Sequence, residues 1–156
     1  MMMKRKKLLQ LIMGRKIYTS NEQEYDITII EIKLSDEFNI VNFLDVDDYL
    51  YKGDNLNDIY QEQKYIYLIH YPKGFKAKLS FGKIKNISED NNEIKHLSDT
   101  DEGSSGCPIF NLFNYKIIGV HKGDHKIFEF QLGTVLKKLL FHLIIIKKKY
   151  KFEYRF

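Results

Sequence analysis

Tryptophan is absent from this sequence of 156 residues, which also has a single cysteine, two prolines and no long apolar run. The one cysteine, Cys107, excludes an internal disulfide and fits a reducing compartment. The stretch "LLQLIM" is too short for the apolar core of a signal peptide, and no small-residue cleavage site follows it. The stretch "FHLIIIKKK" falls far short of the roughly 20 residues that cross a bilayer. These absences predict no membrane partner and favour the cytoplasm, without assigning a location.

Charge of either sign is nearly balanced, since 25 Lys and Arg residues oppose 21 Asp and Glu residues and leave a formal net charge of +4. Much of the excess lies at the two ends, in "MMMKRKKLLQ" and "IIIKKKYKFEYRF", where like-charged runs are usually solvated tails. Because the basic residues form no stripe, we expect no nucleic-acid partner. His121, Asp124 and His125 are close in sequence, but they lack a cysteine or glutamate at ligand spacing. We therefore expect neither a metal nor a cofactor.

Short runs of alternating polarity, rich in β-branched residues, indicate strands over most of the chain. The expected strands are residues 25–34, 64–72, 77–87 with a bulge at Gly82, 107–111 and 115–123; residues 88–93 are expected to be a loop. Apolar residues recur at helical spacing only in residues 133–144, which predicts one helix there. Residues 6–18 are ambiguous, and we favour a strand. The pattern predicts an all-β barrel or sandwich with a terminal helix.

The stretch "TDEGSSGCPIF", from Thr100 to Phe110, places two serines between glycines and then resumes an apolar run after a proline. A simple turn does not need Gly103, Gly106 and Pro108 together around a pair of hydroxyls. We expect this loop to hold one side chain at a fixed angle. Gly/Ser tripeptides also occur in ordinary turns, so the loop alone does not decide its function.

The loop resembles the G-x-S-G-x-P motif around the nucleophile of trypsin-like serine proteases, which have the chymotrypsin fold. The blocks "EYDITIIEIKL", "HYPKG", "LSFGKI", "GSSG" and "IIGVHKG" follow in the order of the glutamyl-endopeptidase-like branch. The resemblance covers roughly residues 17–143. It implies a double β-barrel with the first barrel truncated, plus a C-terminal helix. It also implies three segments: residues 1–50 as the remnant of the first barrel, 51–143 as the second barrel with its helix, and 144–156 as a basic tail.

The resemblance assigns catalytic roles to three residues. Ser105 would be the nucleophile, and Asp26 would be the acid that orients the histidine base. The backbone N–H groups of Gly103 and Ser105 would form the oxyanion hole, because a glycine permits the backbone conformation that turns the N–H inward. Cys107, two positions after the serine, is expected only to pack.

The resemblance also implies a substrate-binding surface. Thr100 and His121 match the positions that hydrogen-bond a P1 carboxylate, which hints at a preference for Glu that weakens as pH rises through the titration of His121. Lys122 and Gly123 would belong to the strand that pairs with the substrate backbone. The expected partner is therefore a protein or peptide substrate.

One departure from the family pattern is serious. The fold requires a histidine before the aspartate, but all five histidines follow Asp26: His70, His96, His121, His125 and His142. We therefore expect an N-terminally incomplete endopeptidase that is inactive as given, because the serine hydroxyl has no base. The alternatives are a pseudoprotease that binds peptides and, ranked last, a basic barrel that binds nucleic acid. Exposed strand edges of an opened barrel would favour self-association.

Overall fold

The computed structural model describes residues 15, 17–21, 25–33, 43–52, 55–90, 92–124, 129–137 and 139–141. The chain divides into two compact units, Met1–Phe43 and Leu44–Phe156, and each is described by itself. Across the described ranges, no helix has both the length and the apolar character that spanning a membrane requires.

The first unit contains a small antiparallel sheet of two strands, β1 (Ile17–Thr19) and β2 (Thr28–Ile30). Asp26 lies in the turn before β2 with a positive φ of 50°, and its N–H donates to the carbonyl of Asn21 at 2.9 Å. The strand expected over residues 25–34 is therefore shorter than predicted. Residues 6–14, for which we favoured a strand, lie outside the described residues.

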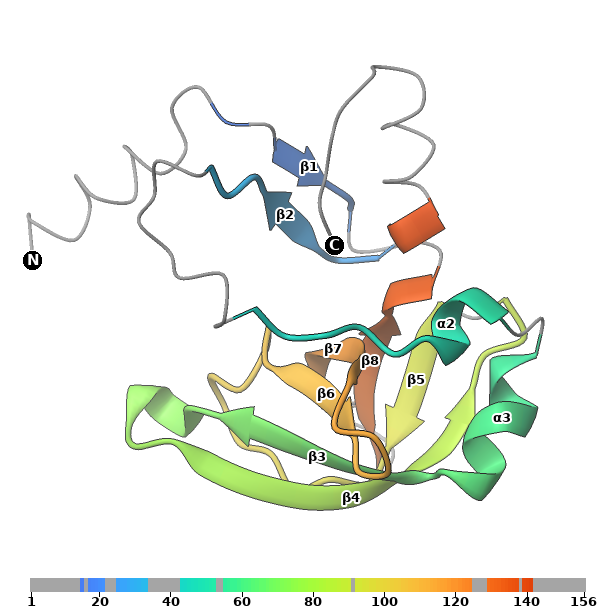
Figure 1. Ribbon diagram of the computed structural model, residues 1–156. Coiled ribbons are helices and arrows are strands. Elements are labelled where there is room, and N and C mark those ends of the chain that lie inside the picture. Colours follow the sequence, from blue (N-terminus) through green and yellow to red (C-terminus); the bar gives the residue numbers. More distant parts are fainter. Residues whose placement is uncertain are drawn as a thin grey trace, which may run out of the picture. The chain divides into compact units, whose positions relative to one another are not determined.

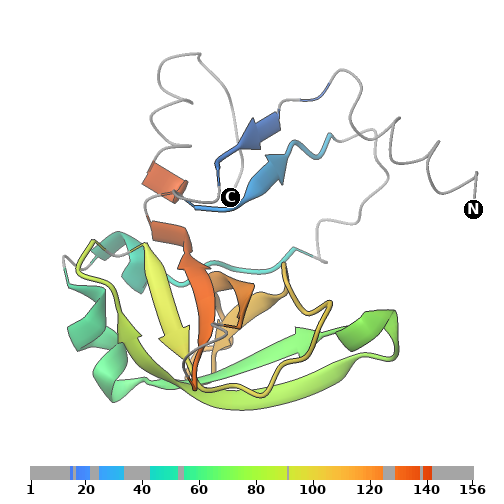
Figure 2. The ribbon, with the colours of Figure 1, turned by 180° about the vertical axis from the view of Figure 1, so that it is seen from behind.

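The second unit is a closed barrel of six antiparallel strands, as Figures 1 and 2 show. The strands are β3 (Tyr65–His70), β4 (Lys78–Ile87), β5 (Glu93–His96), β6 (Pro108–Asn111), β7 (Ile117–Asp124) and β8 (Gln131–Val135). Around the barrel they follow the order β3-β4-β5-β8-β7-β6, and β6 pairs with β3 to close it. The all-β expectation is confirmed. Closure leaves no unpaired edge in this sheet, and self-association through the edges of a truncated first barrel stays a prediction.

Alternation along the strands fills the barrel with branched aliphatic side chains. The fully buried ones include Ile66, Leu68, Ile94, Ile109 and Ile118. Burying each such side chain contributes about 1.5–3 kcal/mol, so this interior is the main source of stability in the unit. Gly133 on β8 is required here, because a Cβ atom would lie 2.5 Å from Cδ1 of Ile109 and 2.8 Å from Cγ2 of Ile94.

Two short helices precede the barrel strands, and the sequence analysis did not predict them. They are α2 (Tyr49–Lys52) and α3 (Leu56–Glu62). The side chain of Asn55 caps α3 by accepting the N–H of Asn57 at 3.1 Å. Leu56 and Tyr60, four residues apart on one face, are the buried residues of α3. A helix of two turns offers too few repeats for its periodicity to be recognised.

Two further expectations need correction. The helix predicted over residues 133–144 is wrong at its start, because β8 continues to Val135 and helical residues occur only at 136–137 and 139–141. Residues 142–144 lie outside the described residues. The bulge predicted at Gly82 is also misplaced: Gly82 pairs regularly with Ile66, and the register shifts between Ile84 and Asn86 instead. Gly82 serves a close approach, since a Cβ there would collide with Ser98.

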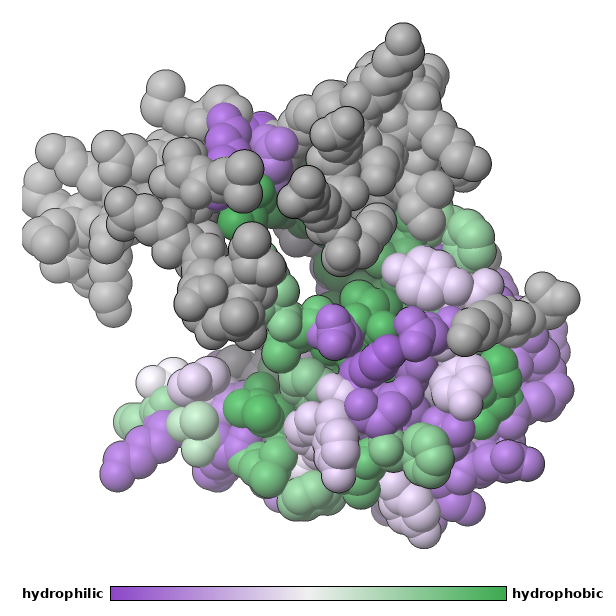
Figure 3. All heavy atoms as spheres, viewed as in Figure 1, coloured by the Kyte–Doolittle hydropathy of each residue, from purple (hydrophilic) through white to green (hydrophobic). Residues whose placement is uncertain are grey.

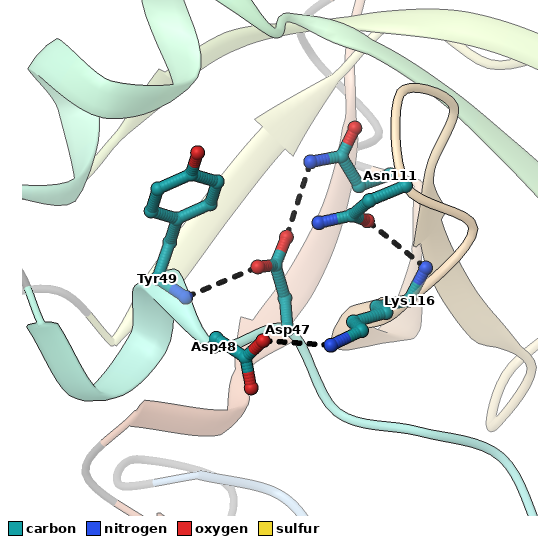
Figure 4. A network of polar contacts seen from close by, with 6 residues as sticks. Asp47, Asp48, Tyr49, Asn111 and Lys116 are labelled. Carbon is teal, nitrogen blue, oxygen red and sulfur yellow. Dashed lines mark hydrogen bonds and ion pairs between the residues drawn. The ribbon is translucent and has the colours of Figure 1, made fainter.

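A buried carboxylate, Asp47, connects the segment before α2 to the barrel (Figure 4). Its Oδ1 accepts the N–H of Tyr49, and its Oδ2 accepts Nδ2 of Asn111 at the end of β6, both at 3.1 Å. At the surface beside it, Asp48 pairs with Lys116 at 2.7 Å. A buried charge is tolerated here because hydrogen bonds replace its water.

Candidate active site

The loop that carries the serine motif, residues 97–107, joins strands on opposite sides of the barrel. β5 and β6 are three places apart in the ring of six, so the loop crosses one end of the barrel. Gly103 and Gly106 have φ values of 83° and 88°, the left-handed region that favours glycine. A Cβ at Gly103 would also lie only 3.1 Å from the backbone nitrogen of Lys73. Both glycines therefore allow a left-handed turn in the loop, and Gly103 also allows the close approach of the Lys73 backbone.

Ser105 is exposed at the tip of this loop, as a nucleophile must be. Its Oγ donates a hydrogen bond to the carbonyl of Lys122 at 2.6 Å. Two backbone hydrogen bonds next to this contact fasten the loop to β7: Gly106 N–H donates to the carbonyl of His121, and His121 N–H donates to that of Cys107. Within the described part of the chain, no imidazole nitrogen hydrogen-bonds to Ser105 Oγ.

Of the three consecutive backbone N–H groups at Gly103, Ser104 and Ser105, the middle one has a hydrogen-bond acceptor among the described residues. The N–H of Ser104 donates to the carbonyl of Asp101 at 3.1 Å, three residues earlier. The N–H groups of Gly103 and Ser105 have no hydrogen-bond acceptor among the described residues. The two residues named for an oxyanion hole therefore each have a backbone donor without an acceptor among the described residues, as such a hole requires.

The neighbouring serine, Ser104, has a different environment that sequence reasoning missed. It is buried, and its Oγ lies 2.8 Å from Nδ1 of His70 on β3. The other ring nitrogen of His70 lies 2.8 Å from Oγ of Ser80 on β4. Ser104 Oγ also accepts the N–H of Asp101 at 3.3 Å. His70 thus bridges the barrel wall to the residue just before Ser105, and it serves the loop rather than the nucleophile.

A second buried histidine pair occupies the barrel interior. Nε2 of His96 on β5 lies 3.2 Å from Nδ1 of His121 on β7. Burial, with a smaller contribution from the neighbouring His121, lowers the pKa of His96 to about 3. His96 is therefore neutral at physiological pH. Its Nδ1 accepts the N–H of Ser98 at 3.4 Å, so its proton is on Nε2 and is donated to His121.

This tautomer fixes the protonation of the partner ring. Nδ1 of His121 acts as the acceptor from His96, so the proton of neutral His121 is on Nε2. Thr100, the other residue expected at a P1 pocket, donates its hydroxyl to Oε1 of Gln131 at 2.9 Å. Gln131 pairs directly with His96 across β5 and β8. His96 therefore contacts His121, and Gln131 contacts Thr100, the two residues that the sequence placed at a P1 pocket. These contacts depend on strand register, which the sequence does not show.

Asp26 belongs to the first unit, whereas Ser105 belongs to the second. Asp26 is exposed, and its backbone N–H closes the turn before β2. Asp99 and Asp101, which flank Thr100, are both exposed, and Asp101 pairs with Lys73 at 3.5 Å. No group of three His, Cys, Asp or Glu side chains in the described ranges could hold a metal ion. Cys107 packs against the barrel core, as expected, and burial raises the pKa of its thiol to about 11.

The sequence matches the model of a family described as the C-terminal domain of lysyl endopeptidase, and the match covers residues 3–126. The chain belongs to this family. A comparison with curated proteins found no significant match. Membership agrees with the resemblance to trypsin-like serine proteases on which the sequence analysis relied.

Solved structures place the chain among chymotrypsin-like serine proteases by fold. Rv3671c from M. tuberculosis H37Rv, a serine-to-alanine mutant in an inactive form, has a TM-score of 0.57 at 14% identity, over 87% of this chain and 66% of that one. A Glu endopeptidase in complex with MPD has a TM-score of 0.58 at 20% identity, over 86% and 62%. Tobacco etch virus protease, complexed with product, has a TM-score of 0.53 at 16% identity, over 85% and 53%. The chain therefore spans between half and two thirds of the length of these proteases.

Proposed function

We propose that the chain is a trypsin-like serine endopeptidase domain in which Ser105 attacks the carbonyl carbon of a peptide bond. The observation that carries the proposal is the exposed Ser105 hydroxyl beside two backbone N–H groups, of Gly103 and Ser105, that lack an acceptor in the described chain. Those two donors would bind the carbonyl oxygen as it becomes an oxyanion, a contribution that typically amounts to about 2.7–4 kcal/mol per donor.

The substrate backbone would align along β7 at Lys122. The register between β7 and β8 shifts between His121 and Gly123, so Lys122 has no partner on β8. Such bulges re-aim backbone groups next to active sites. A peptide that hydrogen-bonds to the carbonyl of Lys122 would displace the Ser105 hydroxyl from it and release that hydroxyl for attack.

A second candidate function is peptide binding without cleavage. It is favoured by one observation, that Ser105 Oγ donates to a backbone carbonyl rather than to an imidazole. Asp26 would orient a histidine base if one is supplied, but none of the five histidines precedes it in the sequence. The two functions share the same groove and differ only in whether a base reaches Ser105.

Labelling with a fluorophosphonate probe distinguishes them. The probe modifies a serine only where a base and an oxyanion hole activate it. The 156-residue chain alone has no histidine before Asp26, so we expect no label on it. When a segment that carries a histidine base is supplied, we expect label that maps by mass to Ser105, disappears in Ser105→Ala and weakens in Asp26→Asn. A folded chain that binds peptides but stays unlabelled with that segment present would replace the endopeptidase proposal with the second function. Label on Ser104 instead would refute both assignments.

For specificity, we propose that His121 and Thr100 bind a P1 carboxylate, with His96 fixing the ring of His121. In the tautomer assigned above, the proton of His121 is on Nε2, and a P1 carboxylate would accept a hydrogen bond from that nitrogen.

The test of specificity is a peptide series that varies only at P1, measured by cleavage or by competitive binding. We expect Glu to be favoured over Lys and Phe, because a carboxylate accepts a charge-assisted hydrogen bond that the other two side chains cannot. His121→Ala should lower that preference by about 1.5–3 kcal/mol, a hydrogen bond to a charged group. The matched family is named for lysyl endopeptidase. Faster cleavage after Lys than after Glu would refute a pocket that binds an acidic P1 side chain, and it would favour the exposed carboxylate of Asp99 as the group that binds a P1 lysine.

A further inference from the structure

The hairpin formed by β3 and β4, residues 64–87, carries charge of only one sign. It contains six lysines and no aspartate or glutamate: Lys64, Lys73, Lys76, Lys78, Lys83 and Lys85. The whole chain has a net charge of only +4, so acids elsewhere offset this concentration. The hairpin is therefore a strongly basic segment of the second unit, and it is separate in sequence from the basic ends of the chain.

The outer face of the same hairpin is apolar. On β3, Ile66, Leu68 and His70 point into the barrel, so the residues between them face outward. Six large apolar or aromatic side chains of the hairpin are exposed: Tyr65, Ile69, Tyr71, Phe75, Leu79 and Phe81. Ile69 and Leu79 are direct partners across the two strands, 44% and 54% exposed. Apolar side chains that gather on one exposed face, rather than singly, are typical of an interaction site.

These two properties coincide at the end of the hairpin. Figures 1 and 2 show this end projecting beyond the other strands, and it closes through a 3-10 turn, Pro72–Gly74. Phe75 follows the turn with 75% of its surface exposed, and Lys76 and Lys78 are exposed beside it. Figure 3 shows hydrophobic and hydrophilic side chains intermixed on this projecting end. Among the tip lysines, Lys73 pairs with Asp101 at 3.5 Å, and the pKa of that carboxyl group is lowered first by the backbone N–H of Glu102, with a smaller contribution from Lys78.

We propose that this projecting end docks on an anionic lipid surface. Tyr71 and Phe75 would enter the headgroup region, while Lys76 and Lys78 would bind the lipid phosphates and carboxylates. The sequence analysis expected no membrane partner because no segment could span a bilayer. Docking by a loop requires no span. The inference is independent of whether Ser105 hydrolyses peptides.

A single-stranded nucleic acid would also be attracted to lysines and aromatic rings. The structure favours lipid for two reasons. Ile69 and Leu79 offer no ring for a base to stack on, yet they continue the apolar surface toward the tip. Tyr67, the ring at the centre of the outer face, is already stacked on Phe110 with centroids 4.7 Å apart. A hydrocarbon boundary matches this surface better than a row of bases.

Sedimentation with vesicles tests the proposal on the full 156-residue chain. Vesicles of phosphatidylcholine with about a third phosphatidylserine should bind the chain, and vesicles of phosphatidylcholine alone should bind it much less. Replacing both Lys76 and Lys78 by Gln should weaken binding about 30-fold, because each lysine near an anionic surface contributes about fivefold. Phe75→Ala should weaken it about tenfold through the lost apolar insertion.

Two matched controls separate the hairpin end from general charge and hydrophobicity. Phe113→Ala removes a ring that is 72% exposed in the turn between β6 and β7, and it should leave binding unchanged. The double change Lys83→Gln and Lys85→Gln removes the same charge about 16 Å or more along β4 and should cost less than about threefold. The lysines at the chain ends are common to all variants and cancel.

Three outcomes would overturn the proposal. The first is equal loss in the hairpin-end and control variants, which would assign binding to net charge alone. The second is equal binding to both kinds of vesicle. The third is tight binding of a single-stranded oligonucleotide that depends on Lys76 and Lys78 but not on Phe75, which would replace lipid by nucleic acid.

Discussion

Replacing His96 tests the description of the barrel interior most directly. His96 is fully buried, and burial lowers the pKa of its ring to about 3, well below the value of about 6.5 for the unfolded chain. Between these two values the unfolded state binds a proton that the folded state cannot. Stability must therefore fall as pH decreases below about 6.5. His96→Gln keeps a polar side chain of similar reach and removes this titration.

The size of the effect follows from linkage. From about pH 7.5 to about pH 5, a neutral folded His96 and an unfolded ring with its ordinary pKa reduce the free energy of unfolding by about 2 kcal/mol. For a unit of this size, that corresponds to a fall in Tm of roughly 8 °C. The loss would continue at about 1.4 kcal/mol per pH unit until the pH approaches about 3, the folded pKa.

Urea denaturation followed by circular dichroism, at about pH 7.5 and about pH 5, measures this contribution as a difference of differences. Titrating groups that do not contact His96 are the same in the original chain and in His96→Gln, so their contributions cancel between the two. We expect the original chain to lose about 2 kcal/mol more than the variant on acidification. If both lose the same amount, His96 is not held neutral in the fold, and the tautomer assigned to His121 fails with it.

Three other substitutions or reactions test separate parts of the structure. Asp47→Ala should lower the free energy of unfolding by about 3 kcal/mol in urea denaturation, because Tyr49 and Asn111 each lose a hydrogen bond to a buried carboxylate. Asp47→Asn should lower it less, and equal stability of the original chain and both variants would contradict the network. Gly133→Ala should cost about 1–3 kcal/mol, since its Cβ would press on the core, and an unchanged Tm would show that the barrel is less tightly packed. Cys107 should react with iodoacetamide about 100-fold more slowly than an ordinary thiol near pH 8, because burial raises its pKa to about 11. Unfolding in urea should abolish this difference, and rapid alkylation of the folded chain would be inconsistent with burial of the thiol.

The barrel was predictable because its signals are local. Residues 64–72 and 77–87 alternate in polarity and are separated by a proline and a glycine, and both became strands close to the expected bounds. The end of the chain was harder. Leu136, Leu139 and Leu140 follow helical spacing, but the residues before them are held in β8 by pairing with both β5 and β7. Tertiary pairing therefore overrode a local helical pattern that extended three residues, a little less than one turn, too far toward the N-terminus.

The site was predictable only where glycine and serine chemistry is local. Gly103 and Gly106 can adopt left-handed conformations because they lack a Cβ, and the sequence predicted a special backbone conformation for Gly103. Contacts between distant residues could not be found this way. His70 lies 34 residues before Ser104 and His96 lies 25 before His121, and each contact depends on a strand register that no local pattern specifies. The role of Asp26 stays a prediction, because it belongs to the other unit.

The path of the serine loop across the end of the barrel has a consequence for how the protein folds. Strands β3, β4 and β5 can pair in succession as the chain collapses, but the loop cannot take its final course until β8 joins β5 and β6 joins β3. Those pairings close the ring between residues far apart in sequence, and such contacts are slow to form. The amide of Gly106, which donates to His121 on β7, should become protected from hydrogen exchange only in this last step. The candidate active site would then be the final part of the domain to assemble, and a partly folded chain would not expose a reactive serine.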